Sequence, residues 1–210
     1  MPAPEALIFL DTCSLLETCW IRTPPDTWLH SPEKEACFWS ETLPTLQAIG
    51  RIIVPARVYD ELKKHASNQE KPELAQRSHV VLEKLKLLRK RNSIEVFGDP
   101  NDPFADAIML SVALKFRTQN NLLFVTQDRN LAHDLIAVAN FQSVRPRKGA
   151  ELKVRRISTK GTLGKHRNLE NATQQNRNTA PLRPKTQAPK TQKSTPSKER
   201  NLPWHLSILS

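Results

Sequence analysis

The chain has 210 residues, enough for one domain and a substantial extension, and it carries a formal net charge of +11. That charge is unevenly placed. Residues 1 to 150 hold 19 Lys and Arg against 18 Asp and Glu, whereas residues 151 to 210 hold 13 against 3. The three cysteines, at positions 13, 19 and 37, are odd in number and lack the paired spacing of a zinc site. This pattern excludes a disulfide-stapled secreted domain and indicates a reducing compartment, which we expect to be the cytoplasm.

Membrane attachment is also excluded by the sequence pattern. No stretch approaches the roughly 18 consecutive apolar residues that a membrane span needs. The apolar segment from Leu7 to Leu16 is interrupted by Asp11, has no basic region before it and has no small-residue cleavage site after it, so it does not resemble a signal peptide. We therefore expect a soluble protein with no membrane partner, while the oligomeric state stays open.

Short apolar runs alternate with amphipathic stretches along the first 150 residues, the former indicating strands and the latter helices. In chain order we expect a strand over 7–10, a short helix through Trp20 and an irregular proline-rich loop over 22–32. A helix over 33–49, ended by Gly50, and a strand over 51–54 come next. They are followed by a helix starting at Pro55, a loop over 65–72 and a basic helix over 73–91. An apolar run over 94–97, a helix from Asp102 to Arg117, a strand over 122–126, a helix over 130–140 and a last strand over 141–144 follow. This alternation predicts an α/β fold with a parallel sheet between helices.

The composition changes in the last third of the chain. From about Ser158 onward apolar residues become rare, and Lys, Arg, Gln, Asn, Thr and Pro dominate. Such a segment cannot bury enough surface to offset the entropy lost on ordering. We therefore expect a folded domain over 1–150 and a basic, largely disordered tail over 151–210, which ends in a short apolar peptide from Leu202 to Leu209.

Four acidic residues follow the predicted strands or lie on the helices after them: Asp11, Glu61, Asp106 and Asp128. On its helix Glu61 lies at the edge of the apolar stripe, whereas Asp60 points away from it. Because ligands of open α/β sheets bind outside the carboxyl ends of the strands, these acids should converge. Carboxylates that converge cannot all stay ionised without a cation among them. An all-oxygen set without His or Cys selects a hard cation such as Mg²⁺ or Mn²⁺.

The same acids carry a resemblance to a known family. The order Asp11-Thr12, then Pro55-x-x-Val58-x-x-Glu61-Leu62, then Asp106-Ala107-Ile108, then Thr126-x-Asp128-Arg129 resembles the PIN-domain family of metal-dependent nucleases. The resemblance covers residues 5 to about 148, with all four acids in the family's order and on the expected elements. It implies a three-layer α/β/α fold and metal-dependent hydrolysis of phosphodiester bonds, usually in RNA.

The resemblance also implies roles for the four acids, all of which would be catalytic. Asp11 and Asp106 would be the principal ligands of two Mg²⁺ or Mn²⁺ ions, and Glu61 and Asp128 would complete the site directly or through water. Two such ions can activate the attacking water and stabilise the leaving oxygen.

Four further residues stand close to these motifs. The hydroxyls of Thr12 and Thr126 can hold the ligating carboxylates from behind. Asp102 is either a fifth ligand or only the N-cap of its helix. Cys13 sits inside the first motif, and we expect its thiol to be packed beneath the site rather than reactive.

The basic tail points to nucleic acid as a partner. Its Lys and Arg residues can neutralise several phosphates, an attraction that is independent of sequence and weakens with salt. We expect RNA to bind the basic residues at its start: Lys153, Arg155, Arg156, Lys160, Lys165 and Arg167. A charged, unstructured tail without a partner is the alternative. The apolar peptide from Leu202 to Leu209 suggests docking on a protein partner.

These observations together predict a divalent-metal-dependent endoribonuclease. Two alternatives stay open. The first is a catalytically inactive PIN-like scaffold that binds RNA, in which the acids are too few or too misaligned to hold a metal pair. The second is a structure-specific DNA nuclease related to the flap endonucleases. The natural substrate and the biological role, whether in RNA processing, in defence or as a toxin, do not follow from the sequence.

Overall fold

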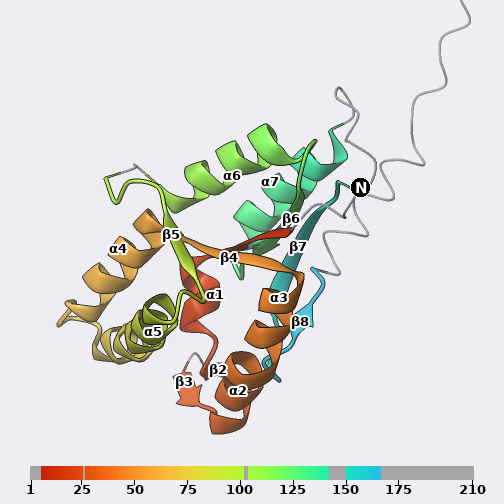
Figure 1. Ribbon diagram of the computed structural model, residues 1–210. Coiled ribbons are helices and arrows are strands. Elements are labelled where there is room, and N and C mark those ends of the chain that lie inside the picture. The colour runs from red at the N-terminus through yellow and green to blue at the C-terminus, as the bar shows by residue number, and fades with distance from the viewer. Residues whose placement is uncertain (1–5, 26, 102–103, 142–149, 167–210) are drawn as a thin grey trace, which may run out of the picture. The chain divides into compact units, whose positions relative to one another are not determined.

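A parallel β-sheet forms the centre of the protein (Figure 1). The computed structural model describes residues 6–25, 27–101, 104–141 and 150–166. In these residues one sheet has the strand order β5-β4-β1-β6-β7-β8. Its members are β1 (Ala6–Leu10), β4 (Gly50–Pro55), β5 (Glu95–Phe97), β6 (Asn121–Val125), β7 (Leu152–Ile157) and β8 (Leu163–Gly164). Neighbouring strands from β5 to β7 pair in parallel, and β8 pairs antiparallel with β7.

Helices flank this sheet, which confirms the predicted α/β class. The α6 helix (Ala105–Phe116) and the α7 helix (Arg129–Asn140) lie together on one side of the strands (Figure 1). The α1 helix (Thr12–Leu16) contacts α4 (Ala56–Ala66) and α5 (Pro72–Lys90), which pack closely against each other. Among the described helices, none is both long and apolar enough to cross a membrane.

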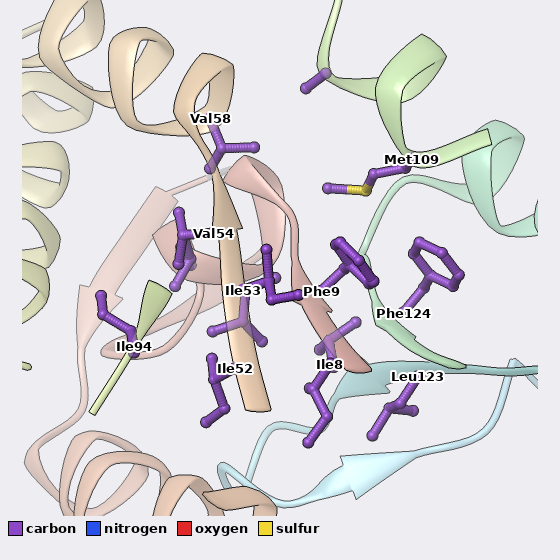
Figure 2. Close-up of a cluster of buried hydrophobic side chains, with 14 of the residues drawn as sticks. Ile8, Phe9, Ile52, Ile53, Val54, Val58, Ile94, Met109, Leu123 and Phe124 are labelled. Carbon is purple, nitrogen blue, oxygen red and sulfur yellow. The ribbon is translucent and has the colours of Figure 1, made fainter. Parts of the chain in front are cut away.

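The hydrophobic core lies where the three central strands meet the helices. Phe9 of β1 pairs in register with Ile53 of β4 and with Phe124 of β6, so these side chains share one face of the sheet. The rings of Phe9 and Phe124 stack with their centroids 5.0 Å apart, and Met109 of α6 lies beside them (Figure 2). Ile8, which is fully buried, points to the opposite face. Burial of each such side chain contributes roughly 1.5–3 kcal/mol.

Most predicted elements are present with small shifts at their ends. The strands over 7–10, 51–54, 94–97 and 122–126 correspond to β1, β4, β5 and β6, and the helices over 73–91 and 130–140 to α5 and α7. The helix expected to start at Asp102 instead begins at Ala105, with Phe104 as its N-cap. Asp102 itself lies outside the described residues, as does most of the last strand expected over 141–144.

A β-hairpin replaces the loop expected over residues 22–32. The first helix ends at Leu16 rather than Trp20, and β2 (Trp20–Thr23) pairs antiparallel with β3 (Thr27–His30). Aromatic and β-branched residues, which favour strands, stand on both sides of the Pro24-Pro25 turn. The prolines therefore occupy the turn, where a missing N–H costs nothing, and do not interrupt the pairing.

The long helix expected over 33–49 is divided into three parts. They are α2 (Pro32–Cys37), a π-helical segment (Phe38–Thr42) and α3 (Leu43–Ile49). In the middle part the N–H of Leu43 donates to the oxygen of Phe38, five residues back. Pro44 follows directly and has no N–H to donate, so an unbroken ladder of i to i−4 hydrogen bonds is impossible here.

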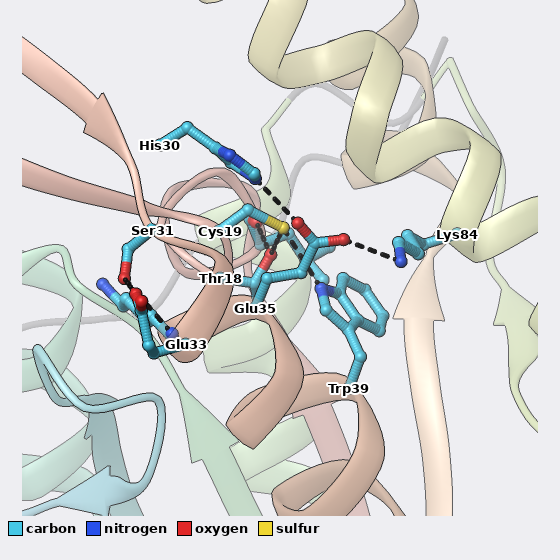
Figure 3. A network of polar contacts seen from close by, with 10 residues as sticks. Thr18, Cys19, His30, Ser31, Glu33, Glu35, Trp39 and Lys84 are labelled. Atoms are coloured by element: carbon cyan, nitrogen blue, oxygen red, sulfur yellow. Dashed lines mark hydrogen bonds and ion pairs between the residues drawn. The ribbon is translucent and has the colours of Figure 1, made fainter.

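A polar network joins the β2–β3 hairpin and α2 to α5 (Figure 3). Glu35 of α2 lies 2.7 Å from Nε2 of His30 and 2.8 Å from Nζ of Lys84. The hydrogen bond from Lys84 is the main reason why the pKa of Glu35 lies below its usual value. Below it, Nε1 of Trp39 donates to Sγ of Cys19 at 3.3 Å. These contacts hold the hairpin against the body of the domain.

The sheet extends into the part of the chain that was expected to be tail. β7 pairs in parallel with β6, from Leu152 opposite Leu122 to Arg155 opposite Val125, and its Val154 and Ile157 are buried. The expected boundary at residue 150 is therefore placed too early, since β7 and β8 both follow it. Five basic residues among positions 151 to 166 mask the apolar positions of β7 when only composition is considered. The sequence beyond 166 lies outside the described residues.

Gly50 ends α3, as the sequence predicts, but it does so in an extended conformation with φ 176°. Its lack of a side chain matters because β1 passes close by: a Cβ at this position would lie 2.0 Å from the backbone oxygen of Ala6. We expect Gly50→Ala to lower the free energy of unfolding by about 1–3 kcal/mol, as overpacking does, in urea denaturation. Gly164→Ala is the matched control, because a Cβ there meets nothing closer than 3.8 Å. Equal losses in both variants would contradict the steric explanation.

Candidate acidic site

The four predicted acids are carried on elements that start at the carboxyl edge of the central strands. Asp11 directly follows β1 and is the N-cap of α1, and Asp128 is the N-cap of α7 after β6. Glu61 lies in the middle of α4, which follows β4, and Asp106 lies in the first turn of α6. Parallel pairing of β1 with both β4 and β6 thus brings segments far apart in sequence to one edge.

Asp11 is the most deeply buried of the four acids, with 5% of its surface exposed. Its Oδ1 accepts the N–H of Thr12 at 2.7 Å, and its Oδ2 accepts the hydroxyl of Thr126 at 2.8 Å. Its own N–H donates to the oxygen of Val125 at 3.1 Å. Burial raises the pKa of Asp11, and the hydrogen bonds oppose that rise because they stabilise the ionised form. The carboxylate thereby links β1 to the end of β6.

Glu61 is tied to the same motif through Thr12. The hydroxyl of Thr12 donates to Oε2 of Glu61 at 2.7 Å, and Nε of Arg57 lies 3.4 Å from Oε1. The neighbouring Asp60 instead pairs with Lys64 at 2.8 Å. The choice of Glu61 over Asp60 from helical phase therefore agrees with the geometry, in which Glu61 alone of the two contacts the Asp11 motif.

Asp128 is the N-cap of α7. Its Oδ1 accepts the N–H groups of Asn130 and Leu131, at 2.7 and 3.1 Å. Its own N–H donates to Oγ1 of Thr126 at 3.0 Å, the same hydroxyl that donates to Asp11. Thr126 therefore positions two of the four acids at once, one through its hydroxyl proton and the other through its lone pair.

The ionisation of Asp106 shows that the acids act on one another. Asp106 is exposed at the surface, but partial desolvation and then the negative charges of Asp11, Asp128, Glu61 and Asp134 raise its pKa to about 6. Like charges raise a carboxyl pKa only at short range, because solvent and salt screen distant charges. The four side chains thus share one negative field, which a bound cation would relieve.

The donor set fits a hard divalent cation in chemistry but is not assembled around one. All four groups are carboxylates, the donors that Mg²⁺ and Mn²⁺ prefer. Within the part of the chain that the structure describes, however, no three His, Cys, Asp or Glu side chains are grouped so that they could hold a metal ion. Glu61 is held by Thr12 and Asp128 by its helix. These carboxylates thus already have hydrogen-bond partners of their own.

Cys13 lies between Asp11 and Thr126. Its thiol donates to Oδ2 of Asp11, stands 3.5 Å from Oγ1 of Thr126 and accepts the N–H of Gln127 at 3.2 Å. Burial, with the charge of Asp11 adding to it, raises the pKa of Cys13 well above its usual value. The thiol is therefore protonated at neutral pH and serves here as a hydrogen-bonding and packing group, not as a nucleophile.

The basic residues expected to bind nucleic acid lie on β7 and after it, in different surroundings. Lys153 pairs with the neighbouring Glu151 at 2.8 Å, and Arg155 donates to a backbone oxygen of its own strand at 2.9 Å. Lys160 is exposed in the connection between β7 and β8, and Arg167 lies outside the described residues. The remaining two, Arg156 and Lys165, line a cavity.

This cavity, called the basic pocket below, has a volume of about 580 Å³. Five cationic side chains line it: Arg22, Lys34, Arg129, Arg156 and Lys165. Glu17 is the one acid among its lining residues. The sequence did not indicate Arg22, Lys34 or Arg129 as site residues, because they come from separate elements. The only available signal was the position of Arg129, next to the predicted acid Asp128.

The raised pKa of Asp106 predicts an unusual dependence of stability on pH. The native state holds this proton up to about pH 6, whereas an unperturbed aspartate releases it near 3.8. The free energy of unfolding should therefore fall as pH rises from about 4 to about 6 and stay lower above that range. Asp106→Asn should leave stability near pH 3.5 unchanged and raise it at pH 7, as measured by urea denaturation.

Asp60→Asn is the control for this experiment. Its hydrogen bond with Lys64 lowers the pKa of Asp60, so any contribution of Asp60 has the opposite sign and is lost as pH falls. Asp60 is only partly buried and its ion pair with Lys64 lies at the surface, so its effect should be small. A pH profile that Asp106→Asn leaves unaltered would show that this carboxyl ionises normally.

Comparison with known proteins does not assign this chain to a family. A scan of the chain against protein-family models gives no match, and a search of curated proteins finds none that is similar to it.

Proposed function

We propose that this protein is a divalent-metal-dependent nuclease that cuts RNA within the strand. The observation that carries the proposal is the position of the acids at one edge of a parallel sheet, where Thr12 joins Asp11 to Glu61 and Thr126 joins Asp11 to Asp128. Such a concentration of carboxylates is costly unless a cation compensates for it. The PIN-like order of the same acids in the sequence supports a nuclease, and PIN-like is also the fold type that we propose for the α/β domain.

The residues around the acids would prepare the site for this chemistry. Divalent ions bound here would activate a water molecule and stabilise the leaving oxygen. The N–H of Thr12 and the hydroxyl of Thr126 fix the plane of the Asp11 carboxylate, and the hydroxyl of Thr12 holds Glu61 toward it. Asp106, exposed in the first turn of α6, would lose its proton when a cation is present. Its ionisation therefore links cation binding to pH.

Neighbouring acids on α4 provide the sharpest test of activity. Glu61→Gln should reduce Mn²⁺-dependent cleavage of single-stranded RNA by about 10²-fold or more, as expected for loss of a group that stabilises the transition state. Asp60→Asn, one residue away and paired with Lys64, should leave the rate within about twofold. The assay is gel mapping of cleavage products with and without EDTA. Equal rates for both variants would remove Glu61 from the proposed site.

Metal binding can be measured without any substrate. Mg²⁺ or Mn²⁺ should raise the melting temperature of the parent protein, because a ligand that binds only the native state adds about 2.7 kcal/mol at a concentration of 100 Kd. Asp11→Asn should abolish that rise while the variant stays folded by circular dichroism. If neither cation changes the melting temperature of the parent protein, the proposed metal site is contradicted.

A scaffold that binds RNA without cutting it is the second candidate. It is favoured by the finding that, among the described residues, no three metal-binding side chains are grouped for coordination. A parent protein that binds RNA yet yields no products with Mg²⁺ or Mn²⁺ would establish this candidate. Flap DNA and duplex DNA belong in the same assay, because preferred cleavage of flap DNA would instead establish the DNA nuclease.

A further inference from the structure

The basic pocket is a neighbour of the acidic site. Gln127 separates them: its N–H donates to Sγ of Cys13 on the acidic side, while its side-chain amide donates to Oε2 of Glu17 at 2.8 Å on the pocket side. The next two residues also lie on different sides: Asp128 is one of the four acids, and Arg129 lines the pocket. A ligand that fills the pocket would therefore extend toward the acids.

The pocket is built to attract an anion. Its five cations come from β2, α2, α7, β7 and the residue after β8, so the fold brings them together from separate parts of the sequence. Lys34 is only 3% exposed and donates to the oxygen of Trp20 at 2.8 Å, which fixes its charge in the wall. Against these stands Glu17 as the one acid of the lining. A concave surface with such an excess of positive charge concentrates anions.

The remaining lining suits a nucleotide. Ser158 and Thr159 offer hydroxyl groups that can hydrogen-bond to phosphate or sugar oxygens, and Ile21 and Ile157 provide an apolar surface. A volume of about 580 Å³ is typical of sites for small molecules, and it has room for one nucleotide unit.

We propose that the basic pocket binds the phosphate of one nucleotide of single-stranded RNA, next along the strand to the bond that the acidic site would cut. This inference rests on the proposed function and deepens it by assigning a substrate subsite. The acids repel a polyanion, and the pocket beside them supplies the attraction that holds the strand in place. A terminal phosphate and an internal phosphodiester have the same recognition chemistry, and the experiment below separates them.

Binding is measured by fluorescence anisotropy with the full chain, a labelled single-stranded oligoribonucleotide and EDTA, over a series of salt concentrations. The double variant Arg129→Gln/Arg156→Gln removes two exposed pocket cations. We expect it to weaken binding about tenfold and to reduce the slope of log affinity against log salt by about 0.7, the contribution of one neutralised phosphate on a single strand. Lys71→Gln/Lys115→Gln removes the same charge at two exposed lysines outside the pocket and should change affinity less than about twofold.

A second variant is expected to bind RNA more tightly, a result that misfolding cannot produce. Glu17→Gln removes the acid of the pocket but keeps an oxygen to accept the hydrogen bond from Gln127. This variant should bind the same oligonucleotide about threefold more tightly, because the net positive charge of the pocket increases by one. Weaker or unchanged binding would count against an anion in the pocket.

Two oligonucleotides distinguish the sources of the phosphate. If a 5′-phosphorylated strand binds the parent protein more tightly than its 5′-hydroxyl counterpart, and the pocket variant abolishes the difference, the pocket takes a terminal phosphate. If both strands bind the parent equally and the pocket variant weakens both, it takes an internal one. Equal weakening by the pocket and control variants would overturn the inference. Because EDTA prevents cleavage, this binding experiment is independent of the cleavage experiment with Glu61→Gln. The pocket can bind RNA in a protein that does not cut it, and a protein that cuts RNA can lack binding in the pocket.

Discussion

The hydrogen bonds of the Asp11 carboxylate are the interaction on which the geometry of the acidic edge depends. A carboxylate buried at the end of a central strand is stable only if its oxygens find donors, and Thr12 and Thr126 supply them. Each donor has a second contact: Thr12 reaches Glu61 on α4, and Thr126 receives the N–H of Asp128 at the start of α7. One buried group is therefore connected, through these two threonines, to two helices that flank the sheet. This also explains why a site assembled from four separate segments can be well defined although two of its acids are exposed.

Opposite charges are segregated along the same edge. On one side of Gln127 the acids raise the pKa of Asp106, and on the other side five cations line a pocket with a single acid. Salt bridges between the two groups would cancel their charges, but the residue between them, Gln127, is itself uncharged and donates one hydrogen bond to each side. Lys34 and Glu17 show the cost of this arrangement: burial lowers the pKa of the lysine and raises that of the glutamate, and the attraction between them limits both shifts. The acids and the basic pocket, which carry opposite charge, thus lie on either side of Gln127 at the same edge of the sheet.

The sequence predicted the parallel core well because β1, β4 and β6 are short apolar runs in which nearly every side chain is buried. The position of the acids followed from those strands. The β2–β3 hairpin was missed because its two turn prolines suggested a loop, and β7 was missed because its charged residues dominate the composition around Val154 and Ile157. Two cations of the basic pocket, Arg156 and Lys165, were among the residues predicted to bind RNA, but the pocket itself could not be predicted. Arg22 and Arg156, which line it, belong to strands that the sequence did not indicate.

The place of β1 in the sheet has a consequence for the order in which the protein is made. This strand is hydrogen-bonded by β4 on one side and by β6 on the other, and Thr126 lies 115 positions after the Asp11 that it contacts. A growing chain releases Asp11 early, but the carboxylate has no complete set of partners until β6 has left the ribosome. Closing so long a loop also delays the contact relative to local helices. The acidic edge can therefore be completed only after the chain has been made at least as far as Thr126, so this part of the domain forms late relative to the helices that precede it.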